Sequence, residues 1–371
     1  MKQNKLRRLE LVRGEMAKVG VKGLLVNDWA SIFYLSGFDG DTGWLLIGSD
    51  SQFILSDSRF TVQAREQAEG FEYVDTTSKA WDTIALTARE SGLLPLGLEP
   101  RKTTLAEQNW LRHKLRRKDL KPAEGLAELG RAIKDDEEIA LIRKAAKLAD
   151  EALTKILKAS LEGLTEAQLA ALFEYEVRMA GADRTAFPSI IAAGANAAKP
   201  HANCEARVPQ QGEVLLCDLG ASFHHYASDT TRTYSMGRPK GRMGDVYAAV
   251  WEAQRSAVET VGPDVPWRQV DAAARDVLRR TSWNEYFRHG IGHLVGIDVH
   301  DPSPKRRSDD TELILAPGMV ITVEPGVYLE GEGGVRIEDL VLVTDSGCEV
   351  LTAGPNPEHL TSIEEVLAGA G

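Results

Sequence analysis

Short apolar runs alternate with amphipathic stretches along the first 128 residues of the chain. Residues 5–18 place leucines and a methionine among charged side chains, a pattern that predicts a surface helix closing near Gly20. Runs of this kind between helices predict an α/β unit with a mixed sheet. The expected helices after the first are at 58–68 and 104–117, and the expected strands are at 23–26, 32–35, 44–47, 53–55 and 96–98.

A connecting segment at 121–131 is punctuated by proline and glycine and separates two parts of the chain. A chain of 371 residues is long enough for at least two domains. We therefore place a domain boundary at about residue 128, which gives domains 1–128 and 129–371.

The second part carries longer elements. Thr165 and Gln168 have the spacing of an N-terminal capping box, and Gly181 suits the position just past the end of that helix. The whole chain is expected to be of mixed α/β (α+β) class, a small α/β domain followed by a larger one. Further helices are expected at 135–161, 244–260 and 268–281, and strand-like runs stand at 212–219, 226–234, 318–328 and 335–344.

Composition and charge narrow the possible partners and the compartment. Lysine and arginine number 44 against 55 aspartates and glutamates, and the formal net charge of −11 disfavours nucleic acid, which needs a basic face. No apolar run approaches the length that spans a bilayer, so no membrane association is expected. The three cysteines are widely spaced and predict reduced thiols, which favours a cytoplasmic location.

Two aspartates stand next to strand-like runs. Asp218 directly follows an apolar run, so its carboxylate is expected to point into the interior, where it needs a partner or a metal ion. Asp229 comes eleven positions later, a spacing that fits two adjacent antiparallel strands joined by a turn at 222–225. Either aspartate alone would equally well cap a turn, whereas the hairpin would bring both carboxylates to one site.

Three of the eight histidines fall within twelve residues and are interleaved with glycine, which lets the backbone approach a ligand closely. They are His289, His293 and His300. One such histidine alone is ordinary, but the three together indicate a site. His201, taken alone, is an ordinary loop histidine.

Two glutamates repeat the pattern of the aspartates. Glu324 ends an apolar run, and Glu338 follows fourteen positions later, again a hairpin-compatible distance. An isolated glutamate usually forms a solvated salt bridge. Four carboxylates and a histidine, each beside strand-like residues, jointly indicate a two-metal site.

With these motifs taken together, the sequence resembles the creatinase/aminopeptidase P/prolidase group of the "pita-bread" metallopeptidases. The resemblance runs through nearly the whole chain, and the motifs appear in the family's order. It implies a creatinase-like N-terminal domain and a pita-bread catalytic domain. The segments that carry it are 34–38, 55–60 and 63–64 in the first part, and 186–190, 196–201, the two aspartate segments, the histidine-rich segment, 324–326 and 336–339 in the second.

The resemblance also implies roles for single residues. His201, His289 and His300 would line the rim of the site and contact the substrate and its reacting carbonyl, and Arg336 would position the substrate nearby. By the same similarity, the metal ligands would be Asp218, Asp229, His293, Glu324 and Glu338, with Asp229 and Glu338 bridging both ions.

Two positions depart from the family pattern. Leu294 stands where a glycine commonly follows the metal-binding histidine, and Asp301 stands where a glutamate commonly follows the last histidine of the motif. Neither change removes a ligand, so activity is expected to be retained, with a narrower pocket wall near His293.

The donor set also bears on the metals and the reaction. Four carboxylates balance the charge of two divalent cations, and oxygen-rich ligation with one imidazole favours Mn²⁺, with Co²⁺ or Zn²⁺ as possible substitutes. We expect a metal-bridging hydroxide to attack the scissile carbonyl, because divalent metal ions lower the pKa of bound water from about 15.7 to about 7. Glu324 is expected to move the proton to the leaving nitrogen, and His300 or His201 to donate to the oxyanion.

The resemblance implies the substrate, which the residues themselves do not. It predicts an Xaa-Pro aminopeptidase of the aminopeptidase P type, acting on proline-containing peptides, with the chain as a homodimer. An Xaa-Pro dipeptidase of the prolidase type is the nearest alternative. A metal-free amidinohydrolase like creatinase, or a non-catalytic pita-bread binding protein, would be expected to lack ligands that this chain retains.

Overall fold

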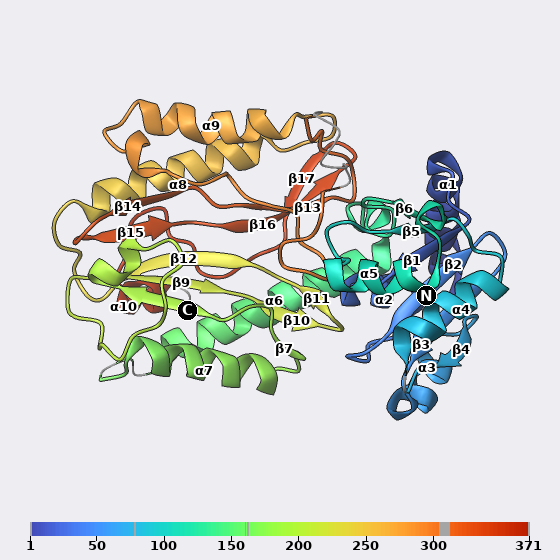
Figure 1. Cartoon of the computed structure of the whole chain (residues 1–371). Coiled ribbons are helices and arrows are strands. Elements are labelled where there is room, and N and C mark those ends of the chain that lie inside the picture. The colour runs from blue at the N-terminus through green and yellow to red at the C-terminus, as the bar shows by residue number, and fades with distance from the viewer. Residues whose placement is uncertain (1, 78, 160, 162, 304–311, 370–371) are drawn as a thin grey trace. The chain divides into compact units, whose positions relative to one another are not determined.

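The computed structural model describes residues 2–77, 79–159, 161, 163–303 and 312–369 (Figure 1). The described chain forms two compact units. One runs up to Arg131 and includes Pro302 and Ser303, and the other comprises Ala132–Asp301 and the residues from 312 onward. The boundary of the functional domains, expected near residue 128, stays a prediction.

The N-terminal unit is built on one six-stranded mixed sheet with the order β4-β3-β2-β1-β5-β6. Neighbours β1–β2 and β2–β3 are antiparallel, and β3–β4, β1–β5 and β5–β6 are parallel, which confirms the expected mixed sheet. The strands are β1 (Gly23–Val26), β2 (Trp44–Gly48), β3 (Gln52–Ser56), β4 (Glu72–Asp75), β5 (Leu96–Leu98) and β6 (Leu120–Pro122). The α-helices are α1 (Lys2–Val19), α2 (Trp29–Ser36), α3 (Thr61–Gln67), α4 (Ala80–Glu90) and α5 (Leu105–Lys114).

The strand predicted at 32–35 is wrong, because these residues lie in α2. Asp28 caps the helix by accepting a hydrogen bond from the Ser31 amide at 3.1 Å, and Gly37 closes it in the left-handed region at φ 83°. A short apolar run has no periodicity that separates a buried helix from a buried strand. The two caps decide between them.

The second unit places its strands between two pairs of helices (Figure 1). Its sheets have the orders β12-β9-β8, β13-β16-β17, β14-β15 and β11-β10-β7. The strands are β7 (Arg184–Thr185), β8 (Ile190–Ala193), β9 (Val214–Leu219), β10 (Ala221–Phe223), β11 (Tyr226–Ala227), β12 (Thr230–Ser235), β13 (Val320–Val323), β14 (Gly326–Leu329), β15 (Gly333–Arg336), β16 (Asp339–Thr344) and β17 (Gly347–Val350). The α-helices are α6 (Asp136–Lys158), α7 (Glu166–Met179), α8 (Met243–Thr260), α9 (Trp267–Arg279) and α10 (Ile363–Gly369).

Strand β9 shows why the strands lie between helices. Val214 and Leu216 pack in the apolar cluster that includes α8 and α9, whereas Leu215 and Cys217 pack in the cluster of α6 and α7. Successive side chains of a strand point to opposite faces. Both faces of β9 are therefore buried, as the apolar run before Asp218 predicts.

Three of the predicted strand-like runs each divide into two strands. The run at 226–234 covers β11 and most of β12, that at 318–328 covers β13 and most of β14, and that at 335–344 covers the end of β15 and all of β16. The capping box at Thr165 and Gln168 is confirmed at the start of α7. No helix in the described part of the chain is both long and apolar enough to span a bilayer.

Candidate functional site

The first pair of strands brings two aspartates together. Asp218 lies near the end of β9, and Asp229 stands immediately before β12. The two strands are antiparallel, with Thr231 opposite Asp218. Between them, β10 and β11 form a hairpin whose turn residues His224 and His225 adopt positive φ angles of 47° and 69°. The predicted antiparallel arrangement of the two aspartate segments is confirmed.

The second pair of strands brings two glutamates to the same place. β13 pairs with β16, with Val323 opposite Asp339, and β14 pairs with β15. Glu324 and Glu338 lie at the break between these two ladders. A bridge between Thr231 and Glu338 then joins the glutamate hairpin to the aspartate hairpin.

His293 reaches these carboxylates from the histidine-rich segment. Its amide donates to the Thr322 hydroxyl at 3.0 Å. Its Nε2 lies 3.5 Å from Asp229 Oδ2 and 3.6 Å from Glu324 Oε1. Ligand atoms of Asp229, His293 and Glu338 all lie within 4.8 Å of one another, a spacing that one metal ion could bridge.

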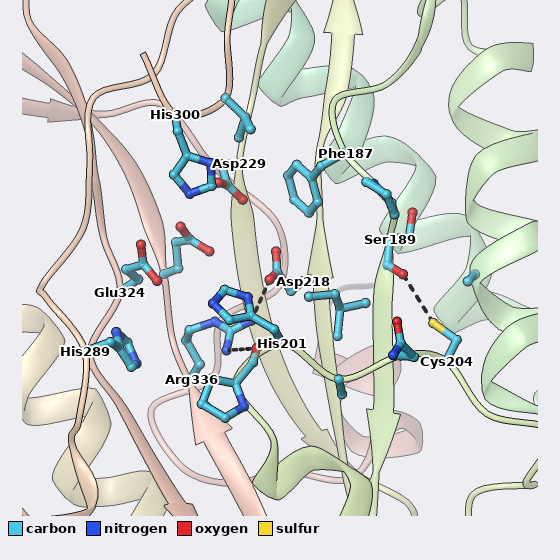
Figure 2. Close-up of a pocket in the computed structure, with 18 of the residues that line it drawn as sticks. Phe187, Ser189, His201, Cys204, Asp218, Asp229, His289, His300, Glu324 and Arg336 are labelled. Atoms are coloured by element: carbon cyan, nitrogen blue, oxygen red, sulfur yellow. Dashed lines mark hydrogen bonds and ion pairs between the residues drawn. The ribbon is translucent and has the colours of Figure 1, made fainter. Parts of the chain in front are cut away.

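A cavity of about 820 Å³ contains the whole predicted set. Figure 2 shows the carboxylates of Asp218, Asp229 and Glu324 directed towards its centre, with His289 and His300 at its edge. The lining includes every residue predicted for the site, namely His201, Asp218, Asp229, His289, His293, His300, Glu324, Arg336 and Glu338.

The electrostatics of the cluster favour a cation. Burial raises the pKa of Asp229 well above its ordinary value, and the nearby Asp218 and Glu324 carboxylates raise it further. Burial, then the charges of Asp229 and Glu324, raise the pKa of Glu338 in the same way. Burial also raises the pKa of Glu324. These three carboxylates are therefore costly as free anions and favourable as ligands of cations.

Two buried carboxylate oxygens that lack a hydrogen-bond partner in the described structure also indicate a cation site. Asp218 Oδ1 and Asp229 Oδ1 are buried and have no hydrogen-bond partner within the ranges that the structure describes. A buried polar atom without a partner costs free energy. Carboxylate oxygens with one imidazole form a donor set for divalent cations such as Mn²⁺. The residues present therefore fit a divalent metal site.

Arg336 is buried behind the carboxylates. Its Nη2 donates to Asp218 Oδ2 at 2.5 Å, its Nη1 to the Tyr328 hydroxyl at 2.8 Å, and its Nε to the Thr231 hydroxyl at 3.0 Å. Thr231 donates in turn to Glu338 Oε2 at 2.6 Å. The guanidinium thus orients two of the four carboxylates, while its predicted role in substrate positioning stays a prediction.

The rim histidines differ in their surroundings. His289 Nε2 lies 3.0 Å from the Tyr328 hydroxyl, and burial lowers the pKa of His289 to about 4, so its ring is neutral at pH 7. The ring of His300 lies 4.0 Å from that of His293, centroid to centroid. Burial, followed by the charge of His293, lowers the pKa of His300.

Sequence reasoning missed Glu166, the first residue of α7. Its carboxylate is fully buried and accepts hydrogen bonds from the amides of Ala193 and Glu205 at 2.8 Å and from the Asn196 side chain at 2.7 Å. These bonds span the segment that carries His201. A glutamate after a capping threonine is usually read as part of a helix start, so the sequence contains no signal for this second role.

A buried ion pair lies beneath the histidine-rich segment. Lys134 Nζ lies 3.2 Å from Asp301 Oδ2, and each side chain is only 1% exposed. The Asp301 amide donates to the Leu294 carbonyl at 2.8 Å, which closes a loop between His293 and His300. Asp301 is one of the two departures from the family pattern, and here it anchors that loop.

We expect Lys134→Met to destabilise the protein by about 3–5 kcal/mol, because it removes one member of a buried ion pair. Lys147→Met is the matched control, since Lys147 and Glu151 form an exposed pair at 68% and 47% exposure, and its cost should stay below about 1 kcal/mol. Denaturant unfolding measures both. Adding Asp301→Asn to Lys134→Met should recover part of the loss, and equal costs for the two single variants would contradict this role.

Comparison with known proteins covers both units. The sequence matches the model of metallopeptidase family M24 over residues 140–345 and that of the creatinase/prolidase N-terminal domain over residues 8–133. The Xaa-Pro dipeptidase of Pyrococcus horikoshii is 34% identical over 342 residues, which cover 91% of this chain and 94% of that protein.

Solved structures agree with these matches. The Xaa-Pro dipeptidase from Bacillus anthracis has a TM-score of 0.90 at 34% identity and covers 95% of this chain and 99% of that chain. The X-Pro aminopeptidase from Thermotoga maritima has a TM-score of 0.84 at 30% identity, with 94% and 99% covered. The resemblance found in the motifs and the mixed α/β pita-bread fold are confirmed, and the chain belongs to metallopeptidase family M24, in its creatinase-like group.

Proposed function

We propose that the chain is a metal-dependent exopeptidase that hydrolyses the bond between an N-terminal residue and a following proline. The observation that carries the proposal is the convergence of four carboxylates and one histidine in one cavity. The names of the similar proteins from Pyrococcus horikoshii, Bacillus anthracis and Thermotoga maritima support the Xaa-Pro bond as the target.

In the proposed site, the carboxylates of Asp218, Asp229, Glu324 and Glu338 and the imidazole of His293, all of which line the cavity, would hold two divalent cations. Such ions supply Lewis-acid polarisation of the scissile carbonyl and a more acidic water at neutral pH. Mn²⁺ is the proposed physiological metal, because oxygen donors predominate in the set. The cytoplasmic location and the homodimer stay predictions.

Glu324 is the proposed proton carrier. Its Oε1 accepts a hydrogen bond from the Thr322 hydroxyl at 3.2 Å, which orients the carboxylate. Glu324 takes one proton from the attacking water and delivers it to the proline nitrogen as the C–N bond breaks. That nitrogen belongs to a tertiary amide without an N–H, so it leaves as an amine only after it gains this proton.

The rim histidines are proposed to bind the reacting groups. His201 or His300 donates a hydrogen bond to the carbonyl oxygen as it gains negative charge. His289 remains neutral because its pKa is lowered to about 4, and its ring, held by Tyr328, forms a wall for the substrate.

Substrate length separates two candidate functions. An aminopeptidase P would cleave long peptides, whereas a prolidase would cleave only Xaa-Pro dipeptides. Two of the three similar proteins named above are Xaa-Pro dipeptidases, at 34% identity each, and one is an X-Pro aminopeptidase at 30%. These names favour an Xaa-Pro dipeptidase of the prolidase type as the second candidate function.

Turnover of four peptides, measured with Mn²⁺ and after chelation, tests the proposal. We expect cleavage of Ala-Pro but not of Ala-Ala, loss of activity with chelator, and recovery when Mn²⁺ is returned. Equal rates on Ala-Pro and Ala-Ala, or full activity in chelator, would contradict it. Ala-Pro-Pro and Ala-Pro-Ala then distinguish the two functions, because only an aminopeptidase P cleaves them.

A further inference from the structure

The cavity continues past the metal ligands towards α7. In Figure 2, Ser189 and Cys204 lie on the opposite side of Asp218 from His289 and Glu324. The cavity lining also includes four residues of α7. We call this extension the α7 arm; it is lined by Ala167, Ala170, Ala171, Glu174, Ser189 and Cys204.

The α7 side of the arm consists of three alanines and one glutamate. Ala167, Ala170, Ala171 and Glu174 have the spacing i, i+3, i+4 and i+7 and therefore share one helix face. Three methyl side chains leave room beside the helix, and they form an apolar strip. Glu174 is the charged residue among the α7 residues that line the arm in the described structure.

The charge of Glu174 is not balanced locally. Within the described ranges its carboxylate has no hydrogen-bond or ion-pair partner, whereas Glu176 of the same helix is paired with Lys155 at 3.0 Å. Arg336 is the arginine in the cavity lining, and it is held by Asp218. Burial raises the pKa of the Cys204 thiol, and the charges of Glu166 and Glu174 raise it further. The field of Glu174 therefore reaches into the arm.

We infer that the α7 arm binds the side chain of the residue that precedes proline, and that Glu174 favours lysine or arginine there. The inference rests on the proposed function, because the side chain before proline is the group that varies among Xaa-Pro dipeptides, whereas the α-ammonium group is common to all of them. The alkyl stem of lysine suits a strip of alanine methyl groups, and its ammonium group suits the carboxylate at the end of the strip. Glu174 acts here as a specificity residue.

The test compares kcat/KM for Lys-Pro and norleucine-Pro, which differ by one ammonium group. Exposed ion pairs of this kind are weak, so we expect a preference for Lys-Pro of about three- to fivefold at low ionic strength, which added salt reduces. Glu174→Gln should bring this ratio to about one. Glu176→Gln is the matched control on the same helix and should keep the ratio.

A second variant changes the space in the arm and leaves its charge unchanged. Ala171→Leu should raise KM for both Lys-Pro and norleucine-Pro relative to Gly-Pro, because the larger side chain fills the arm. Unchanged KM ratios would overturn the location of the side chain.

Other outcomes are equally decisive. A ratio near one in the unchanged enzyme, or a ratio that Glu174→Gln leaves intact, would overturn the inference while cleavage of Ala-Pro upholds the proposed function. If Glu174→Gln instead altered the ratio of Ala-Pro-Lys to Ala-Pro-norleucine, the arm would hold the residue after proline and the inference would be wrong. Absence of cleavage of every Xaa-Pro peptide would reject the proposed function itself.

Discussion

Asp229→Asn is expected to abolish tight metal binding and to lower kcat/KM for Ala-Pro by more than about 100-fold. Changes to groups that merely orient a metal ligand already cost about 10- to 100-fold, and this change removes a ligand charge from the centre of the cluster. The amide has the same shape as the carboxylate, so the fold should persist. Elemental analysis and steady-state kinetics on the same preparation measure both losses.

The unfolding temperature gives this prediction a second readout. In the metal-free protein the Asp229 carboxylate is crowded by Asp218 and Glu324, so metal-free Asp229→Asn should unfold at the same temperature as the unchanged protein or higher. Mn²⁺ at about 100 times its Kd should raise the free energy of unfolding of the unchanged protein by about 2.7 kcal/mol. The increase should be much smaller for the variant. Asp345→Asn, at an exposed position, is the control. A variant that keeps its metal and its turnover would contradict the assignment.

His201→Ala is expected to lower kcat by about 10²–10³-fold and to leave the metal content unchanged. The proposed hydrogen bond to the carbonyl oxygen strengthens as that oxygen becomes charged, so its loss affects the transition state more than substrate binding. His201 lines the cavity but is exposed. Its removal should therefore not disturb the ligands.

The split between kcat and KM distinguishes this role from a structural one. His113→Ala, at an exposed position of α5, should match the unchanged enzyme in every measurement. If His201→Ala raised KM alone, the residue would bind the substrate without stabilising the oxyanion. If metal were lost as well, the segment that Glu166 holds would have a structural role instead.

The spacing within each pair of carboxylates made the pairing of their strands predictable. The intervals from Asp218 to Asp229 and from Glu324 to Glu338 each fit a hairpin, and both hairpins are present. Because each interval joins residues on paired strands, the pattern along the sequence carries information about distance in space. The separation between the two hairpins carries no such information. Their meeting at the Thr231–Glu338 bridge was expected because all four carboxylates stand beside strand-like runs, and the family resemblance implied the same convergence.

Other features could not be predicted from the sequence, for a physical reason. The run at 32–35 is apolar in either conformation, and tertiary burial with two caps made it helical. Lys134 and Asp301 are 167 positions apart and have no local pattern that marks them as a buried pair. Such long-range polar contacts depend on the final packing, which a single sequence does not display.

Anomalous diffraction from crystals of the active, Mn²⁺-loaded enzyme tests the central claim most directly. The account predicts two manganese peaks per chain, both within bonding distance of the side chains of Asp218, Asp229, His293, Glu324 and Glu338. An active enzyme whose manganese lies elsewhere, or whose five side chains contact no metal ion, would contradict it.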